Sequence, residues 1–180
     1  MKTSLGFGYR ARSNEEGMYM DYHVENLILR FVKEDDLSEV ARMWPADHHP
    51  LSNKEAMEAI SYMSGNYVRN TKGSIYHLCL AVCQSNNPGR MMGWCGLDGS
   101  RNHTEPEIFI LLDEPYRGKG YGTLCVKEML RIATEDYAIL SVHGGCAKEN
   151  ISSIRAMEKS GMKQYGTEEN GDPLFRFCAK

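Results

Sequence analysis

A glycine-rich segment after an apolar, strand-like run carries the residue types in this sequence that most plainly suggest chemistry. The segment is Arg117-Gly118-Lys119-Gly120-Tyr121-Gly122-Thr123, and a run with helical spacing follows it. Glycine lets the backbone take positive φ and brings N–H groups close to a ligand. A helix that begins here adds its unpaired N–H groups and the positive end of its dipole. The segment therefore predicts an anion-binding turn whose ligand is a phosphate or a pyrophosphate.

Two familiar phosphate-binding motifs do not fit this turn. A P-loop needs Gly-Lys followed at once by Ser or Thr, whereas Gly118-Lys119 is followed by Gly120. A dinucleotide fingerprint belongs to the first strand–helix–strand unit and needs an acidic residue on the next strand, about 20 positions later. Here the turn comes late, and Glu135-Asp136 precede the next strand-like run. A tight strand-to-helix connection that binds nothing remains the alternative.

The elements that must position this turn follow from the periodicity of the apolar residues. Strands are predicted over Leu27–Val32, Ile75–Cys83, Met91–Leu97, Glu107–Leu112 and Ala138–Val142, with a last hairpin turned by Asn170-Gly171. Helices are predicted from Leu37 to Trp44, Lys54 to Asn70, Thr123 to Ala133 and Asn150 to Ser160. This order describes an α/β domain around one mixed sheet.

Length and charge limit the class of protein further. The chain has 180 residues, a formal net charge of -3 and 42% hydrophobic residues, which suits one domain with one core. Residues 25–180 are predicted to form this domain, and residues 1–24 an N-terminal extension without clear periodicity. A nearly neutral balance argues against a nucleic-acid partner. Because no apolar run approaches the roughly 20 residues of a membrane span, and the start lacks a secretory signal, we expect a cytoplasmic protein without a membrane partner.

The six cysteines and six histidines form no recognisable metal motif. The cysteines are scattered without a Cys-x-x-Cys pair, and most lie in apolar runs, which indicates buried free thiols. The spacing of Cys79, Cys83 and Cys95 matches no common zinc pattern. We therefore predict no metal.

The glycine-rich turn resembles a family signature. Arg117-Gly118-Lys119-Gly120-Tyr121-Gly122 is similar to the Arg/Gln-x-x-Gly-x-Gly/Ala signature of the GNAT superfamily of acyl-CoA N-acyltransferases. Asn26 to Arg30, followed by an acidic helix start, is similar to that superfamily's first strand and helix. Glu107-Ile108 and the stretch from Asn150 to Met162 resemble the branch containing the ribosomal-protein N-terminal acetyltransferases. The resemblance covers the chain from about Glu25 to its end.

The resemblance implies a GNAT-like fold, with a single mixed, largely antiparallel sheet of six to seven strands and about four helices. A V-shaped opening would separate two central parallel strands, Glu107–Leu112 and Ala138–Val142. Acetyl-CoA, as a co-substrate, would lie in this opening.

The same resemblance assigns the contacts of acetyl-CoA. Its pyrophosphate would sit on the N–H groups from Gly118 to Thr123, with Arg117 and Lys119 adding positive charge beside it. The backbone of Leu111 and Leu112 would pair with the pantetheine amides, as an added strand pairs with an open sheet edge. Both basic side chains could instead be solvated surface charges.

The implied reaction is attack of a neutral primary amine on the thioester carbonyl, which needs a proton acceptor and a donor to the departing thiolate. The resemblance implies that Glu107 takes the proton through water, because the superfamily often places its base on this strand; Glu107 could instead form a strand-end salt bridge. The resemblance places Ser153 where its hydroxyl meets the CoA sulfur, and Asn150 where its amide bonds the cofactor's arm. Both residues could instead only cap the helix that follows.

The last hairpin supplies the alternative bases, Glu168, Glu169 and Asp172. No cysteine stands in a Cys/His constellation, so direct transfer is favoured over an acyl-enzyme. The acceptor pocket is expected from the segment Trp44 to Asn70, the strand around Trp94 and the last hairpin. Candidate lining residues are Trp44, His48, His49, Tyr62, Tyr67 and Trp94, with acids at Asp47, Glu55 and Glu58.

The identity of the acceptor stays open at this point. A protein N-terminus, a polyamine, an amino acid and an aminoglycoside are all compatible with the sequence. The protein could also assemble as a homodimer. Two readings from other classes are a non-catalytic acyl-CoA-binding sensor of the same fold and a nucleotide-binding module. The glycine turn combined with Asn150, Ser153 and Glu107 favours the enzyme.

Overall fold

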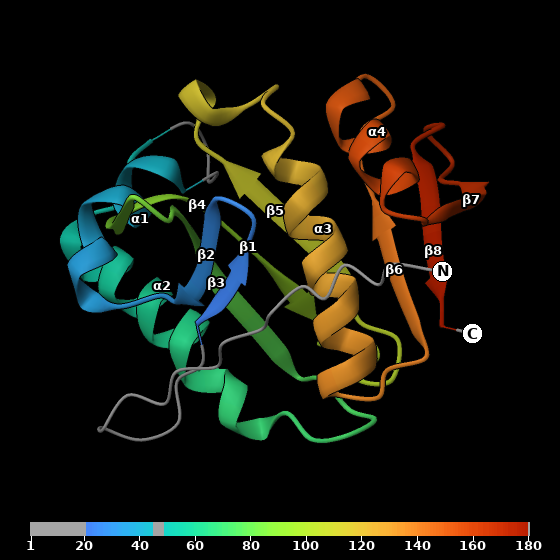
Figure 1. Cartoon of the computed structure of the whole chain (residues 1–180), viewed down its shortest axis with the longest axis horizontal. Helices are drawn as coiled ribbons and strands as arrows, with labels where there is room; N and C mark the ends of the chain where they lie inside the picture. The colour runs from blue at the N-terminus through green and yellow to red at the C-terminus, as the bar shows by residue number, and fades with distance from the viewer. Residues whose placement is uncertain (1–20, 45–48, 180) are drawn as a thin grey trace, which may run out of the picture.

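One mixed sheet forms the centre of the protein (Figure 1). The structure is a computed structural model that describes residues 21–44 and 49–179. Its strands lie in the order β1-β2-β3-β4-β5-β6-β8-β7, and neighbours are antiparallel except for the parallel pair β5 and β6. The strands are β1 (Tyr22–Val24), β2 (Leu27–Phe31), β3 (His77–Gln84), β4 (Asn87–Asp98), β5 (Glu107–Leu112), β6 (Ser141–Gly145), β7 (Lys163–Thr167) and β8 (Pro173–Cys178). The predicted mixed, largely antiparallel sheet is confirmed, with eight strands where six to seven were expected.

The additional strand is β1, which lies within the last residues of the predicted extension 1–24. It pairs with β2 over three residues, from Tyr22 opposite Leu29 to Val24 opposite Leu27. Three residues are too few to show the two-residue alternation by which a strand is recognised in a sequence. Residues 1–20 lie outside the described part of the chain, so the rest of the extension stays a prediction.

The α-helices in the described residues number four, as predicted. They are α1 (Leu37–Met43), α2 (Asn53–Gly65), α3 (Tyr121–Arg131) and α4 (Ile151–Lys159). Short 3₁₀ turns span Glu34–Asp36, Asn66–Arg69 and Glu114–Tyr116, and a π-helical turn spans Ile132–Asp136. Figure 1 shows α3 crossing the near face of the sheet, while α1 and α2 lie on the far face at the left.

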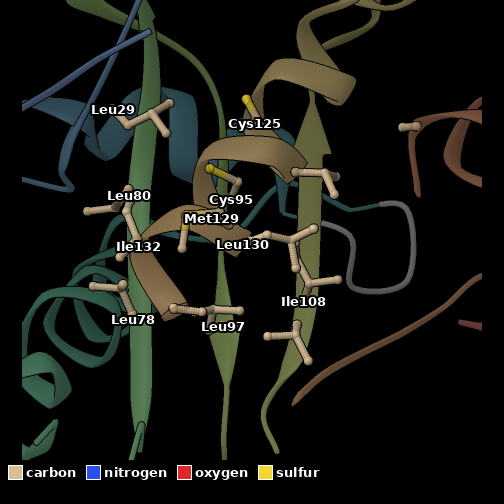
Figure 2. Close-up of a cluster of buried hydrophobic side chains, with 14 of the residues drawn as sticks. Leu29, Leu78, Leu80, Cys95, Leu97, Ile108, Cys125, Met129, Leu130 and Ile132 are labelled. Atoms are coloured by element: carbon tan, nitrogen blue, oxygen red, sulfur yellow. The ribbon is translucent and has the colours of Figure 1, made fainter. Parts of the chain in front are cut away.

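The alternation of side chains along the strands divides the core into two layers. Leu78 and Leu80 of β3 pack with Met129 and Leu130 of α3, as Figure 2 shows. The intervening residues Cys79 and Ala81 face α1 and α2 in a second cluster. On β5 the same alternation sends Ile108 toward α3 and Phe109 toward the α1–α2 face. Glu107, two residues before Phe109, therefore projects on the α1–α2 face.

The two parallel strands meet at one end only. In the pairing of β5 with β6, Glu107 lies opposite His143, next to a hydrogen bond of 3.0 Å from the His143 N–H to the Pro106 carbonyl. By contrast, β5 pairs with β4 along its whole length. In Figure 1 the carboxyl ends of β5 and β6 diverge. The arrangement has the form of the predicted opening between two central parallel strands.

The second of these strands was predicted too early in the chain, over Ala138–Val142. It runs over Ser141–Gly145 because the π-helical turn carries helical backbone on to Asp136. Ala138 then takes a positive φ of 54°, and Leu140 is 73% exposed. These residues are apolar, as a buried strand would be, but they form the link into β6.

Candidate active site

The glycine-rich turn leads directly from the end of β5 into α3. Gly118 and Gly120 have φ values of 72° and 84°, a backbone conformation that favours glycine. A Cβ added at either position would meet no atom within 4 Å, so the surface of the turn is open. The first helical hydrogen bond runs from the Leu124 N–H to the Gly120 carbonyl, 3.2 Å.

The helix therefore begins at Tyr121, two residues before the predicted start at Thr123. The N–H groups of Tyr121, Gly122 and Thr123 belong to the first turn of α3, where helical N–H groups lack an intrahelical acceptor. Together with the positive end of the helix dipole, they suit a pyrophosphate. The residues present thus fit the phosphate end of acetyl-CoA.

Arg117 connects this turn to the sheet. Its Nε donates a hydrogen bond of 2.8 Å to the carbonyl oxygen of Leu112, the last residue of β5. Lys119 is exposed, and its Nζ lies 5.7 Å from the centre of the Tyr116 ring. This hydrogen bond was not predicted from the sequence. It holds the positive charge of Arg117 at the turn.

The backbone of β5 presents Leu112, and not Leu111, to the β6 side. A Cβ on Gly93 of β4 would collide with the Leu111 carbonyl oxygen, which shows that this oxygen faces β4. The Asp113 N–H also bonds to β4, at the Met92 carbonyl, 2.8 Å. Because polar backbone groups alternate in direction along a strand, those of Leu112 point toward the opening.

Asn150 and Ser153 lie at the start of α4. The Asn150 side-chain oxygen accepts hydrogen bonds of 3.1 Å from the Ser153 N–H and from the Ser152 hydroxyl. Asn150 is therefore the N-cap of this helix, which is one of its two predicted roles. The cap uses the backbone of Ser153 and not its hydroxyl. The Ser153 side chain is half-buried.

Glu107 occupies the junction of three neighbouring cavities. It lines an aromatic cavity of about 330 Å³ under α1 and α2, a second of about 550 Å³ beside the last hairpin, and a third of about 500 Å³ beside β6. The residue is exposed at the amino end of β5. A carboxylate in this position can reach a molecule bound in any of the three.

A row of ionisable residues crosses the sheet through Glu107. His77 of β3 stands opposite Asp98 of β4, Asp98 stands opposite Glu107, and Glu107 stands opposite His143 of β6. Directly opposed residues project on the same face of a sheet. The sequence alone did not indicate this row, because it depends on the register of four strands and not on spacing along the chain.

His143 is held by two polar neighbours. Its Nε2 lies 3.3 Å from a carboxylate oxygen of Glu105, and its Nδ1 lies 3.3 Å from the Tyr165 hydroxyl. The Arg176 guanidinium stacks 4.6 Å from the centre of the Tyr165 ring. These contacts fix the imidazole on the strand next to Glu107.

The alternative bases in the last hairpin have unequal environments. Glu168 lines two of the cavities, and Glu169 lines one. Asp172 accepts hydrogen bonds of 2.9 Å from the Lys148 N–H and from the Asn170 amide, one at each carboxylate oxygen. Asp172 therefore stabilises the hairpin, and Glu168 is the stronger alternative to Glu107.

The predicted acceptor residues are brought together only in part. Trp44, Tyr62 and Trp94 line the aromatic cavity. Tyr67 instead packs against Phe31, with 4.6 Å between ring centres and 50° between ring planes. His49 is exposed. Asp47 and His48 lie outside the described residues, and Glu55 caps α2 through the Ser52 backbone N–H, 2.9 Å.

Comparison with known proteins decides the family. A family model described as the acetyltransferase (GNAT) domain matches residues 26–163. The chain belongs to the GNAT acetyltransferase family. The acetyltransferase is 29% identical over 131 residues to YwnH of Bacillus subtilis (strain 168), which is named for phosphinothricin acetylation. That match covers 70% of this chain and 72% of YwnH.

Solved structures confirm the GNAT fold of the acetyltransferase. RimL, a ribosomal L7/L12 alpha-N-protein acetyltransferase, superposes with a TM-score of 0.71 at 14% identity, covering 94% of this chain and 100% of RimL. The microcin C7 self-immunity acetyltransferase MccE, solved with acetyl-CoA and AMP, gives a TM-score of 0.68 at 13% identity, covering 86% of this chain and 93% of MccE. Identities this low support the shared fold alone. The family match makes the protein an N-acetyltransferase.

Within residues 21–44 and 49–179, no helix is both long and apolar enough to cross a membrane. Nor do those residues include three or more His, Cys, Asp or Glu side chains grouped so as to hold a metal ion.

Proposed function

We propose that the protein transfers the acetyl group of acetyl-CoA to a primary amine by direct attack, with Glu107 accepting the proton. The position of Glu107 carries this proposal, because one strand holds it at the junction of the cavities and then leads into the glycine-rich turn. Acetyl-CoA supplies the acetyl group as a thioester. The chain must bind the two reactants side by side and take one proton from the ammonium group before the attack; the second proton that the nitrogen loses balances the one that the departing thiolate takes up.

The glycine-rich turn is assigned to the pyrophosphate and the edge of β5 to the pantetheine arm. The open surface at Gly118 and Gly120 and the start of α3 support the first assignment. The backbone of Leu112 points toward the opening and supports the assignment of the pantetheine arm, although the Leu112 carbonyl already accepts a hydrogen bond from Arg117. We therefore assign the pantetheine contact to Leu112 and not to Leu111.

The amine is assigned to the α1–α2 face, beside Glu107. A carboxylate there can take a proton from the ammonium group directly or through one water molecule. Ser153 is assigned to the leaving thiolate, since its hydroxyl is not used by the helix cap. Asn150 holds the start of α4, and with it the position of Ser153.

Heat protection by acetyl-CoA tests the cofactor site. A ligand that binds only the folded state raises the melting temperature by mass action. We expect acetyl-CoA to raise it in a scanning-fluorimetry titration and pantetheine, which lacks the phosphates, to do so much less. Equal shifts for the two compounds, or no shift with either, would reject the turn as a pyrophosphate site.

Substitution of Ser153 tests its assignment to the thiolate. The hydroxyl would stabilise charge that appears only as the C–S bond breaks, so its loss acts on the transition state and not on cofactor binding. Ser153→Ala should lower kcat by about tenfold or more, with the Kd for acetyl-CoA nearly unchanged. Steady-state kinetics and calorimetry measure the two quantities.

The neighbouring hydroxyl at Ser152 offers the control. It bonds the Asn150 cap, so Ser152→Ala should alter stability more than kcat. If Ser153→Ala keeps full turnover and only melts at a lower temperature, Ser153 only stabilises the start of α4, and its assignment to the leaving thiolate fails.

The second candidate function is an acyl-CoA sensor with the same fold and no chemistry. If the protein is a sensor, acetyl-CoA should raise its melting temperature, and no amine should cause release of free thiol. The junction of three cavities at Glu107 favours the enzyme, because a sensor needs no carboxylate between its ligand and an open pocket.

A further inference from the structure

The aromatic cavity next to Glu107 differs in character from its two neighbours. Its walls include the rings of Trp44, Tyr62, His77, Trp94 and Phe109, and its volume is about 330 Å³. The cavity beside the last hairpin is lined instead by carboxylates and amides of the hairpin turn. A volume near the lower end of ligand pockets suits one small group and not an extended chain.

The rings of this cavity are held in place by contacts with one another. Trp44 and Trp94 lie 5.9 Å apart between ring centres, and the His77 ring stacks on Phe109 at 5.6 Å with 14° between planes. The Tyr62 ring contacts the His77 ring, with 4.8 Å between ring centres. Gly96 makes room for Phe109, since a Cβ there would overlap its ring. The cavity is thus preformed by packing.

One end of the cavity is acidic. Asp98 and Glu107 line it together with the rings, and they stand directly opposite each other on β4 and β5. A cation is attracted both by carboxylates and by the faces of aromatic rings. A protonated amine that enters the cavity would therefore place its charge at this end and its apolar body among the rings.

His77 supplies a second, independent sign of a ligand. The side chain is 7% exposed, and its Nδ1 is buried without a hydrogen-bond partner among the described residues. The nearest carboxylate oxygen, on Asp98, is 4.0 Å away, which is too long for a hydrogen bond. Burial lowers the pKa of the imidazole, with Asp98 opposing that shift. A neutral ring with an unmet nitrogen suits a wall that contacts a polar or cationic guest.

We propose that the acceptor is a primary amine with an aromatic or similarly compact apolar group, and that this group binds in the cavity against the rings of Tyr62, His77 and Phe109. The inference rests on the proposed transferase function and adds the substrate class. A free arylalkylamine and a peptide with an aromatic first residue share this chemistry. Hydroxylated and polycationic amines do not.

The test compares amines that share one reactive group. Phenylethylamine, ethanolamine, spermidine and a tripeptide beginning with phenylalanine are each titrated with acetyl-CoA, and free thiol is followed. We expect kcat/KM for phenylethylamine to exceed that for ethanolamine on the order of a hundredfold, because the ring buries several carbon atoms. Activity with the tripeptide would show that the aromatic cavity accepts protein N-termini. Activity with phenylethylamine alone would show that it accepts free amines.

Two matched tyrosine variants locate the ring. Tyr62 and Tyr165 are 50% and 51% exposed, and they line different cavities, Tyr62 the aromatic one and Tyr165 the one beside β6. Tyr62→Ala should raise KM for phenylethylamine about tenfold and change that for ethanolamine little. A selective rise in Tyr165→Ala instead would overturn the proposal and move the acceptor to the cavity beside β6.

Direct binding separates this inference from the transferase function. Calorimetry of phenylethylamine with the wild-type protein and CoA should show binding that Tyr62→Ala weakens. If phenylethylamine binds in this way but is not acetylated, the assignment of the cavity is supported and the proposed transferase function is rejected. Turnover with ethanolamine or spermidine equal to that with phenylethylamine, or no binding of phenylethylamine, would overturn the cavity assignment.

Discussion

Glu107→Gln should lower kcat by about 100-fold or more, the usual contribution of a positioned general base. Glutamine keeps the shape of the side chain and its place on β5 but cannot accept a proton from the amine. The residue is exposed, so the fold and the affinity for acetyl-CoA should hardly change. Turnover is measured at saturating acetyl-CoA and amine, and the Kd for acetyl-CoA by calorimetry.

Two other carboxylates make this result specific. Glu158→Gln removes an exposed acid from α4, away from the three cavities, and should leave kcat unchanged. Glu168→Gln removes the stronger alternative base, which lines two cavities with Glu107. Full turnover in Glu107→Gln with a large loss in Glu168→Gln would transfer the base to the last hairpin.

Gly120→Asp should weaken acetyl-CoA binding on the order of a hundredfold. Gly120 is the N-cap of α3 with φ of 84°, and a Cβ there meets no atom within 4 Å, so an added side chain has room. The negative charge would stand beside the pyrophosphate, and two like charges about 4 Å apart repel by about 4 kcal/mol at an effective dielectric constant of 20. Calorimetric titration with acetyl-CoA measures the loss.

Gly120→Asn is the matched control for this charge. Asparagine has nearly the same size as aspartate, and both tolerate the left-handed conformation better than other non-glycine residues. The asparagine variant should therefore bind acetyl-CoA clearly better than the aspartate variant, with the difference shrinking at high salt. Equal affinity in the two variants would mean that no phosphate lies at this turn.

The glycine-rich turn was predictable because its physics is local. Positive φ at Gly118 and Gly120 and a helix start directly after them depend on a few consecutive residues. The helix α3 was predictable for the same reason, since Val126, Met129, Leu130 and Ala133 recur at helical spacing and are buried in the core. Local patterns failed at Ala138 and Leu140, where a π-helical turn displaced the start of β6.

The candidate site was only partly predictable because most of it depends on register. His77, Asp98 and His143 are far apart in the chain and meet Glu107 only through the pairing of β3, β4, β5 and β6. Nothing in the spacing along the chain distinguishes them from other polar residues in strands. Part of the role of Asp172 was hidden likewise, because its hydrogen bond from the Lys148 N–H forms only when the hairpin approaches Lys148.

Release of free thiol from acetyl-CoA, followed before and after addition of a primary amine, tests direct transfer most directly. We predict no release and no change in the mass of the intact protein until the amine is added, and then release of one thiol for each acetylated amine. Thiol release with acetylated protein before the amine would contradict direct attack. Tight acetyl-CoA binding without thiol release on any amine tested would contradict the transferase itself.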